Sequence, residues 1–186
     1  MEGKPRSTIP NVHAPCWRRR VIPGGKGLPP LVLTTTASYL DICEFIQHEL
    51  AEYGITVQVD VVPLSTHKQG VAGGDFLFFR KNWIADYPDA ENFLLLFATA
   101  NSAPAGPNYT RFSDPDYDAI YDQALRSTDD GLRLALYEQL DSTLQVRTPA
   151  VFLLHPEVVR FVRSGVEGLQ ADPMNQLDLR RVRKAH

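Results

Sequence analysis

The pattern that most constrains this fold is a strand, a helix and a second strand joined by short links within residues 31–61. The LVLT sequence of Leu31–Thr34 is typical of a short buried strand after two prolines. An apolar stripe at helical spacing predicts a helix over 39–53, and Gly54 follows where a C-terminal cap belongs. Residues 55–61 alternate apolar and polar side chains, as a half-buried strand does. This order predicts a βαβ unit with two parallel strands.

Later segments add strands and helices to this unit, which places the chain in the α/β class with a mixed sheet flanked by helices. Continuous apolar runs predict strands that are buried on both faces. Glycines at 70, 73 and 74 predict a turn-rich link before the first of these runs. A capping side chain before an apolar stripe predicts each of the two longest helices. The predicted elements are strands at 76–79, 151–154 and 158–162, a short helix at 90–97, and helices that follow the caps Asp114 and Thr128.

The composition suits a globular protein without a nucleic-acid partner. The chain has 186 residues, 44% of them hydrophobic and 22% charged, and a formal net charge of −3. So small a charge does not favour binding to nucleic acid or to an anionic membrane. No run approaches the ~18–20 apolar residues that a membrane-spanning helix needs. Residues 1–30 are rich in proline and glycine and show no periodicity, so we expect a poorly ordered N-terminal segment.

The sequence does not match the templates for catalysis or metal binding. It contains no G-x-S-x-G nucleophile elbow and no phosphate-binding glycine loop that ends in Lys-Ser/Thr. The five histidines are scattered, and Cys16 and Cys43 lack metal-ligand spacing. Residues 114–118 resemble the start of a calcium loop but lack its glycine and its bidentate glutamate. We therefore expect no catalytic residues, no metal site and no cofactor.

The stretch that carries most information about function is RKNWIADYPD at 80–89. Ligand sites in α/β sheets gather where strands end and the chain turns away. Here Trp83 and Tyr87 flank Asp86, and an aromatic wall beside a carboxylate suits a cationic group such as an amine. The same residues also suit a plain strand end, with Trp83 in the core and Asp86 satisfying the turn backbone. The residues alone leave both interpretations open.

This stretch is part of an ordered series of motifs that resembles the family 5 extracellular solute-binding proteins, which include the periplasmic oligopeptide- and dipeptide-binding proteins. The series covers about residues 25–183, and its specificity lies in the order of its parts. The motifs are GKGLPP at 25–30 with the LVLT that follows, ICEFIQ at 42–47, Gly54-Ile55, WIADYPD at 83–89, NFL at 92–94, Asn108-Tyr109, DPDYD at 114–118, Thr128-Asp129 with Arg133 and Leu136-Tyr137, and His155-Pro156.

The resemblance implies a periplasmic-binding-protein-like fold, in which two lobes close on a ligand by hinge motion. Residues 31–157 correspond to the second, ligand-binding lobe, and residues 158–186 to a segment that returns to the first lobe in relatives. Relatives are much longer, and no first lobe is recognised in this sequence, so we expect an incomplete two-lobe fold. The peptide lies extended between the lobes and pairs its backbone with strand edges.

The resemblance also assigns roles to six residues between 80 and 87. In relatives, the aspartate that follows Trp-x-Ala holds the α-ammonium group of the peptide. Asp86 occupies that position here, and we expect its carboxylate to be buried and paired. The other assignments are backbone pairing with the peptide for Asn82 and Ile84, binding of a short peptide's carboxylate for Arg80, and apolar walls for Trp83 and Tyr87.

The function implied by the resemblance is that of a peptide-binding subunit, or one lobe of it, in an ABC-type importer, and not that of an enzyme. The expected partners are a peptide and the transporter permease, with self-association through the surface that meets the first lobe in relatives. The resemblance implies a periplasmic protein or a membrane-anchored lipoprotein. The sequence shows no secretory signal, so a cytoplasmic location is expected if Met1 is the true start. The alternative is a truncated, non-transporting remnant or an interaction module that keeps the lobe fold.

Overall fold

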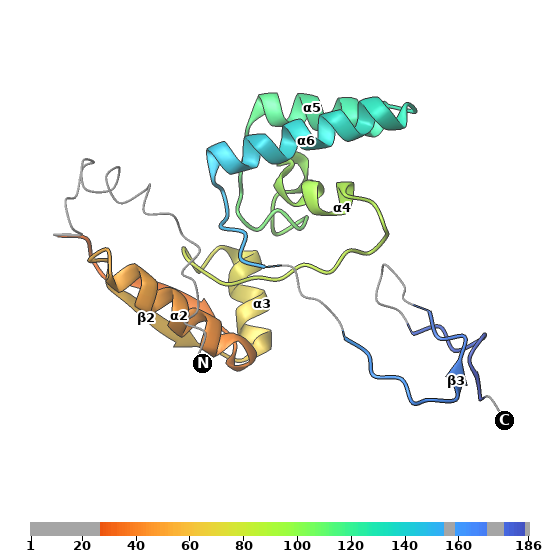
Figure 1. Ribbon diagram of the computed structural model, residues 1–186. Coiled ribbons are helices and arrows are strands. Elements are labelled where there is room, and N and C mark those ends of the chain that lie inside the picture. The colour runs from red at the N-terminus through yellow and green to blue at the C-terminus, as the bar shows by residue number, and fades with distance from the viewer. Residues whose placement is uncertain (1–26, 155–158, 171–176, 185–186) are drawn as a thin grey trace. The chain divides into compact units, whose positions relative to one another are not determined.

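The computed structural model describes residues 27–154, 159–170 and 177–184 (Figure 1). Cys16 and His155 lie outside these residues. So does most of the segment 1–30, for which the sequence predicts poor order.

The chain divides into two compact units, Met1–Asn82 (unit 1) and Trp83–His186 (unit 2). The division lies inside the predicted lobe of residues 31–157, and the predicted boundaries of that lobe stay predictions. Each unit has a hydrophobic core of its own, so the two are described in turn.

Unit 1 is built on the predicted βαβ arrangement. Strand β1 (Leu31–Thr35) leads through a 3-10 turn (Ala37–Tyr39) into helix α2 (Leu40–Ala51). Gly54 then reverses the chain, with a φ of +77° that glycine adopts without strain. Strand β2 (Val57–Val61) pairs with β1 in parallel along its whole length. The predicted helix, its glycine cap and the parallel pairing are confirmed.

A helix that the sequence did not predict follows β2. Helix α3 (Leu64–Gly73) includes residues 70–73 of the stretch predicted as a turn-rich link, and it ends at Gly74, which has a φ of +86°. The turn prediction is wrong because a glycine can serve packing inside a helix. A Cβ atom on Gly70 would collide with the ring of Phe76. The missing side chain therefore lets that ring lie against the helix.

The apolar run at 76–79 forms a short strand edge. Phe79 forms a parallel bridge with Thr34, and two backbone hydrogen bonds of 3.0 Å join Thr34 to the neighbours of Phe79. Leu77 is fully exposed, so the prediction of a strand buried on both faces is wrong. A single bridge fixes only the end of the run, because the residues before it pair with no neighbouring strand among those described.

The core of unit 1 lies between α2 and the β1–β2 pair. Its buried side chains belong to Leu33, Cys43 and Val57. Cys43 is fully buried, which confirms it as a small core residue of the predicted helical stripe. Because β1, β2 and the bridge at Phe79 run in the same direction, their carboxyl ends lie at one edge of the sheet. Thr35 is the last residue of β1 at this edge.

Unit 2 is mainly helical. A short helix α4 (Glu91–Leu94) continues into a 3-10 turn (Leu95–Phe97), which confirms the helix predicted at 90–97. A second 3-10 turn (Thr99–Asn101) and a loop lead to α5 (Pro115–Arg126) and α6 (Asp130–Arg147), which lie side by side (Figure 1).

The two long helices of unit 2 start at acidic caps. The side chain of Asp114 accepts two backbone N–H groups of the first turn of α5, at 3.0 and 3.3 Å, as predicted. Helix α6 begins one residue later than predicted. Its cap is Asp129, whose carboxylate accepts the N–H of Leu132 at 2.9 Å, so the assignment of Thr128 is wrong. Both residues are capping types, and sequence alone does not separate them.

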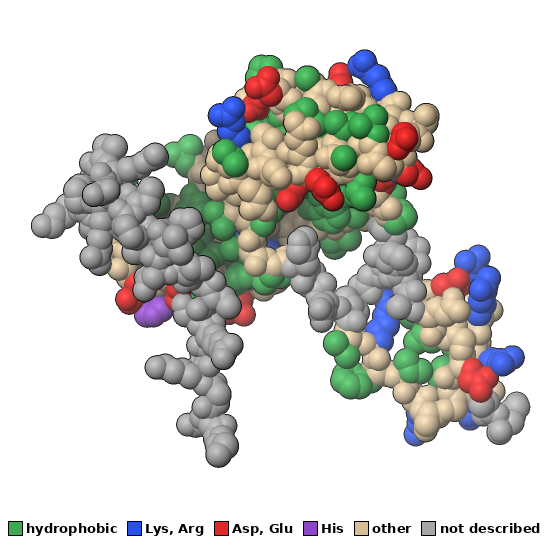
Figure 2. Space-filling view, turned by 45° about the horizontal axis from the view of Figure 1, so that its top comes forward, with side chains coloured by type: hydrophobic (Ala, Val, Ile, Leu, Met, Phe, Trp, Pro, Cys, Tyr) green, Lys and Arg blue, Asp and Glu red, His purple; other side chains and the backbone are tan. Residues whose placement is uncertain are grey.

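The core of unit 2 gathers side chains from α4, α5 and α6. Tyr117 and Leu140 are fully buried at its centre. The ring of Phe112 meets that of Tyr117 edge to face, with 5.6 Å between their centroids, and the ring of Tyr121 stacks on Tyr117 at 6.5 Å. Hydrophobic side chains also reach the surface of this unit among charged ones (Figure 2). The buried core residues are Leu94, Phe97, Ala98, Tyr117, Tyr121, Leu140 and Leu144.

The strands predicted after α6 are not found. Residues 151–154 are exposed and form no strand, although Phe152 packs edge to face on Phe97 at 6.0 Å. Residues 159–162 are also exposed and form no strand, and Val158 lies outside the described residues. An apolar run becomes a strand only where a neighbouring strand accepts its hydrogen bonds.

A small antiparallel pair completes the described structure. Strand β3 (Val166–Glu167) pairs with β4 (Arg183–Lys184). The α/β class is confirmed, with parallel and antiparallel strands in two separate sheets within the described ranges. No helix in this part of the chain has the length and apolar character needed to cross a membrane.

Candidate ligand-binding site

The loop at the start of unit 2 is held by one buried amide. Asn92, in the first turn of α4, is only 1% exposed. Its Oδ1 accepts the indole Nε1–H of Trp83 at 2.8 Å and the backbone N–H of Asp86 at 3.0 Å. These two bonds fix both the ring of Trp83 and the path of the backbone at Asp86.

The carboxylate of Asp86 takes no part in this network. Asp86 is exposed, and its side chain forms no hydrogen bond or ion pair with a described residue. The prediction of a buried carboxylate is therefore wrong, because the side chain is exposed and only the backbone N–H is bound, while the pairing with a peptide ammonium group stays a prediction. A free carboxylate on a fixed backbone can accept charge-assisted hydrogen bonds from a cation.

The alternative interpretation of this loop as a plain strand end is contradicted in two respects. Trp83 is half-buried, not a core residue. The turn backbone is satisfied by other side chains: Asn92 serves Asp86, and Asp89 Oδ1 accepts the N–H of Glu91 at 2.9 Å. Asp89 thus has the turn-capping role that this interpretation gave to Asp86.

Tyr87 is attached to the body of unit 2 through a buried carboxylate. Glu91 is 8% exposed, and each of its two oxygens accepts one tyrosine hydroxyl. Oε2 accepts from Tyr87 and Oε1 from Tyr121 of α5. The hydrogen bond to Glu91 is the main cause that raises the pKa of Tyr87. Burial and then the same carboxylate raise the pKa of Tyr121, so both hydroxyls remain donors at neutral pH.

Arg80 and Asn82 belong to unit 1. The Arg80 guanidinium lies over the ring of Tyr39, 3.2 Å from its centroid, in a cation–π contact. Its Nη1 donates to Asn82 Oδ1 at 3.2 Å. Arg80 Nε is buried and has no hydrogen-bond partner among the described residues. Burial also lowers the pKa of the neighbouring Lys81.

The structure thus brings the six predicted residues together in two groups. Arg80 and Asn82 form one group, at the end of unit 1. The other group lies on the loop of unit 2, where Ile84 is 75% exposed. Sequence reasoning missed the supporting roles of Glu91 and Asn92. The signal was present only in part, because Asn92 was recognised as a motif residue without a role.

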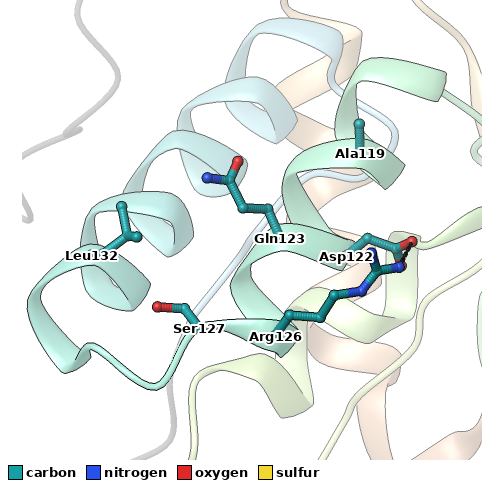
Figure 3. Close-up of a pocket in the computed structure, with 6 residues that line it drawn as sticks. All are labelled: Ala119, Asp122, Gln123, Arg126, Ser127 and Leu132. Atoms are coloured by element: carbon teal, nitrogen blue, oxygen red, sulfur yellow. Dashed lines mark hydrogen bonds and ion pairs between the residues drawn. The ribbon is translucent and has the colours of Figure 1, made fainter.

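A separate surface hollow lies where α5 ends and α6 begins (Figure 3). An exposed ion pair of 3.1 Å joins Arg126 to Asp122 on its wall. None of the predicted site residues takes part in it. Nor does any group of three His, Cys, Asp or Glu side chains within the described ranges form a possible metal site. The residues that line the hollow are Ala119, Asp122, Gln123, Arg126, Ser127 and Leu132.

Comparison with known proteins gives consistent matches. Residues 18–104 match the family model described as bacterial extracellular solute-binding proteins, family 5, middle. The chain is 28% identical to di/tripeptide-binding protein 2 of Pseudomonas aeruginosa over 142 residues, which is 76% of this chain and 27% of that protein. It is 27% identical over 177 residues to probable di/tripeptide-binding protein 5 of the same organism, which covers 91% of this chain and 34% of that protein.

A solved structure shows the same relationship. The ABC transporter-associated periplasmic binding protein DppA from Helicobacter pylori, in complex with the peptide STSA, matches with a TM-score of 0.60 and 25% identity. The match covers 64% of this chain and 24% of that one. The chain therefore spans about a quarter to a third of the length of the relatives it matches. The resemblance and the periplasmic-binding-protein-like fold predicted from the sequence are confirmed.

Proposed function

Since this chain is a relative of the family 5 extracellular solute-binding proteins, we propose that it is the peptide-binding subunit of an ABC-type importer, or one lobe of that subunit. It holds an extended peptide without covalent chemistry. Support comes from the curated relatives, which are named as di/tripeptide-binding proteins, and from the peptide-bound DppA structure. Because these relatives bind solutes, binding rather than catalysis is the proposed activity.

The observation that carries the proposal is the exposed carboxylate of Asp86 on a fixed backbone. Asn92 holds both the N–H of Asp86 and the indole of Trp83, and the carboxylate of Asp86 is not neutralised by any described residue. An α-ammonium group supplies the three N–H donors and the positive charge that such an acceptor requires. Asp86 is therefore the proposed anchor for the peptide N-terminus.

The remaining residues complete the proposed site. The half-exposed rings of Trp83 and Tyr87 act as apolar walls. Arg80 keeps a buried Nε without a described partner, which suits it to accept a carboxylate. The last assignments, backbone pairing with the peptide by Asn82 and Ile84, rest on the resemblance and on their exposure.

Partners and location are proposed on the same basis. The permease of an ABC transporter is the proposed partner, and the proposed location is outside the cytoplasmic membrane; the names of the matching family, extracellular, and of the matching structure, periplasmic, support this location. Self-association is proposed through the exposed apolar side chains of 151–154 and 159–162. Sedimentation velocity over a concentration series measures it, and a constant monomer mass would contradict it.

The test is an NMR titration of the ¹⁵N-labelled chain with trialanine and with N-acetyl-trialanine. We expect trialanine to shift the amide signals around Asp86, and the acetylated peptide, which has no ammonium group, to shift them much less. Asp86→Asn should weaken trialanine binding about tenfold or more, because a hydrogen bond to a charged group is worth roughly 1.5–3 kcal/mol. Asp116→Asn makes the same charge change on an exposed residue of α5 and serves as the control.

Two outcomes oppose the proposal in different ways. Equal binding of both peptides, or unchanged affinity in Asp86→Asn, would show that Asp86 is not the ammonium anchor. Absence of binding by a folded wild-type chain would favour the interaction module as the function of this chain.

A further inference from the structure

The hydrogen bonds of Glu91 connect parts of unit 2 that are far apart in the sequence. One carboxylate oxygen accepts from Tyr87, four residues earlier in the loop, and the other accepts from Tyr121, 30 residues later on α5. Tyr121 is buried, whereas Tyr87 is 42% exposed. The carboxylate therefore joins a fixed helix to a side chain that reaches the surface.

A carboxylate as buried as Glu91 is expensive unless its oxygens are paired. The two hydroxyls supply that pairing, and both are directed to this one acceptor. If this position only had to fill the core, a glutamine or an apolar residue would cost less free energy to bury than a charged carboxylate does. The arrangement is costly for packing, yet it holds one exposed ring in a single orientation.

We infer that Glu91 is a positioning residue, which fixes the ring of Tyr87 as a wall of the ligand site by tying it to Tyr121 of α5. The role of Tyr87 as a wall of the site rests on the proposed function. The hydrogen-bonded link from Tyr87 through Glu91 to Tyr121, called the tie below, is a property of the folded chain. Asn92, the next residue, holds Trp83 and Asp86 in the same way. The first turn of α4 thus positions both aromatic walls and the anchor between them.

The structure offers a matched pair of tyrosines to test this role. Tyr117 and Tyr121 lie one turn apart on α5, and both are buried. The hydroxyl of Tyr117 donates to the backbone carbonyl of Leu94 at 2.8 Å, not to Glu91. Tyr121→Phe and Tyr117→Phe therefore delete the same group from the same helix, but only the first change touches the tie to Tyr87.

The experiment measures Tyr87 directly by NMR of ¹³Cζ-tyrosine in the full chain, with pH titration, and measures trialanine affinity alongside. Glu91→Gln should lower the pH at which Tyr87 ionises, because the acceptor carboxylate that raises its pKa is gone. Glu91→Gln and Tyr121→Phe should each weaken trialanine binding by about threefold to tenfold, the range of one hydrogen bond. Tyr117→Phe should change neither the Tyr87 titration nor the affinity, although it lowers stability.

The outcomes separate this inference from the proposed function. An unchanged Tyr87 titration in Glu91→Gln would overturn the inference, whether or not the chain binds peptide. Equal losses of affinity in Tyr117→Phe and Tyr121→Phe would also overturn it, since they would indicate a general effect of stability. If the wild-type chain binds no trialanine, the proposed function fails. A lower pH of ionisation for Tyr87 in Glu91→Gln would still support the link between Tyr87 and Glu91.

Discussion

The two units of this chain differ in how they satisfy their buried polar groups. In unit 2 the buried polar side chains have partners: Asn108, for example, donates to the carbonyls of Ala98 and Phe112 at 3.1 and 2.9 Å and accepts from Thr110. In unit 1, three buried polar atoms have no hydrogen-bond partner within the described ranges. They are Thr35 Oγ1, His67 Nε2 and Arg80 Nε.

The difference shows in which unit the buried polar groups find their hydrogen-bond partners within the unit itself. Buried polar groups without partners cost free energy, so folded proteins keep few of them. Unit 2 closes its polar network around α4, while the exposed carboxylate of Asp86 has no partner among the described residues. In unit 1, Thr35 and Arg80 lie at the carboxyl ends of the parallel strands, where α/β folds place ligands. Two of the three unpaired atoms of unit 1, Thr35 Oγ1 and Arg80 Nε, therefore lie at this edge of the sheet.

The largest effect is expected where the satisfied network of unit 2 is broken. Asn108→Leu removes an amide that is fully buried, and it leaves the carbonyl of Phe112 without this donor, whereas the carbonyl of Ala98 still accepts the N–H of Asn101 at 3.0 Å. We expect a loss of about 1–3 kcal/mol for the unpaired carbonyl of Phe112, measured as the free energy of unfolding in urea. Asn82→Leu, at an exposed position, is the control and should change stability by less than about 0.5 kcal/mol. Similar values for both variants would contradict the view that unit 2 depends on this network.

Most helices and their ends could be predicted from the sequence, whereas the strands that depend on a distant partner could not. The stripe over 39–53, the glycine at 54 and the cap at Asp114 predicted their elements, because helix ends and apolar periodicity depend on neighbours in the sequence. Helix α3 was missed because its glycines are typical of a turn. One of them, Gly70, is needed for packing instead, because the ring of Phe76, six residues later, lies where its side chain would be. The run at 151–154 failed as a strand because a strand needs a partner that no local pattern names.

The candidate site divides in the same way. The residues that face solvent, Trp83, Asp86 and Tyr87, were singled out from an unusual combination of residue types at a predicted strand end. Glu91 and Asn92 were not assigned roles, because their function depends on burial and on donors such as Tyr121 far along the chain. The expected burial of Asp86 was wrong for a related reason: a motif gives residue types, and only the packing decides which atoms are covered.

A smaller effect is expected from a matched substitution in each unit. Thr35→Val replaces a buried hydroxyl that has no described partner, so stability should stay within about 1 kcal/mol of wild type or rise. Thr110→Val replaces a hydroxyl that donates to Asn108 at 2.9 Å and accepts from the N–H of Phe112 at 3.2 Å. This change should cost about 0.5–1.5 kcal/mol, measured by urea unfolding. A larger loss for Thr35→Val than for Thr110→Val would reverse the comparison between the units.

The smallest effect is expected from the titration of His67 in unit 1. Burial is the main cause that lowers its pKa below 6.5, backbone hydrogen bonding at Thr34 opposes the shift, and the positive charges of Lys81 and Arg80 add to it. Below pH 6.5 the unfolded chain then binds a proton that the folded chain resists, so stability is full above that pH and falls as the pH drops below it.

The measurement compares urea unfolding at pH 7.5 and pH 5.5. His67→Gln cannot titrate, so the variant should lose less stability over this interval than wild type does. His48→Gln, at an exposed position on α2, makes the same substitution outside the buried environment of His67 and is the matched control. Identical slopes for wild type and His67→Gln would show that His67 takes up its proton as easily in the folded chain as in the unfolded one. The unpaired Nε2 would then lie in a polar environment, and the contrast with the closed network of unit 2 would not extend to this residue.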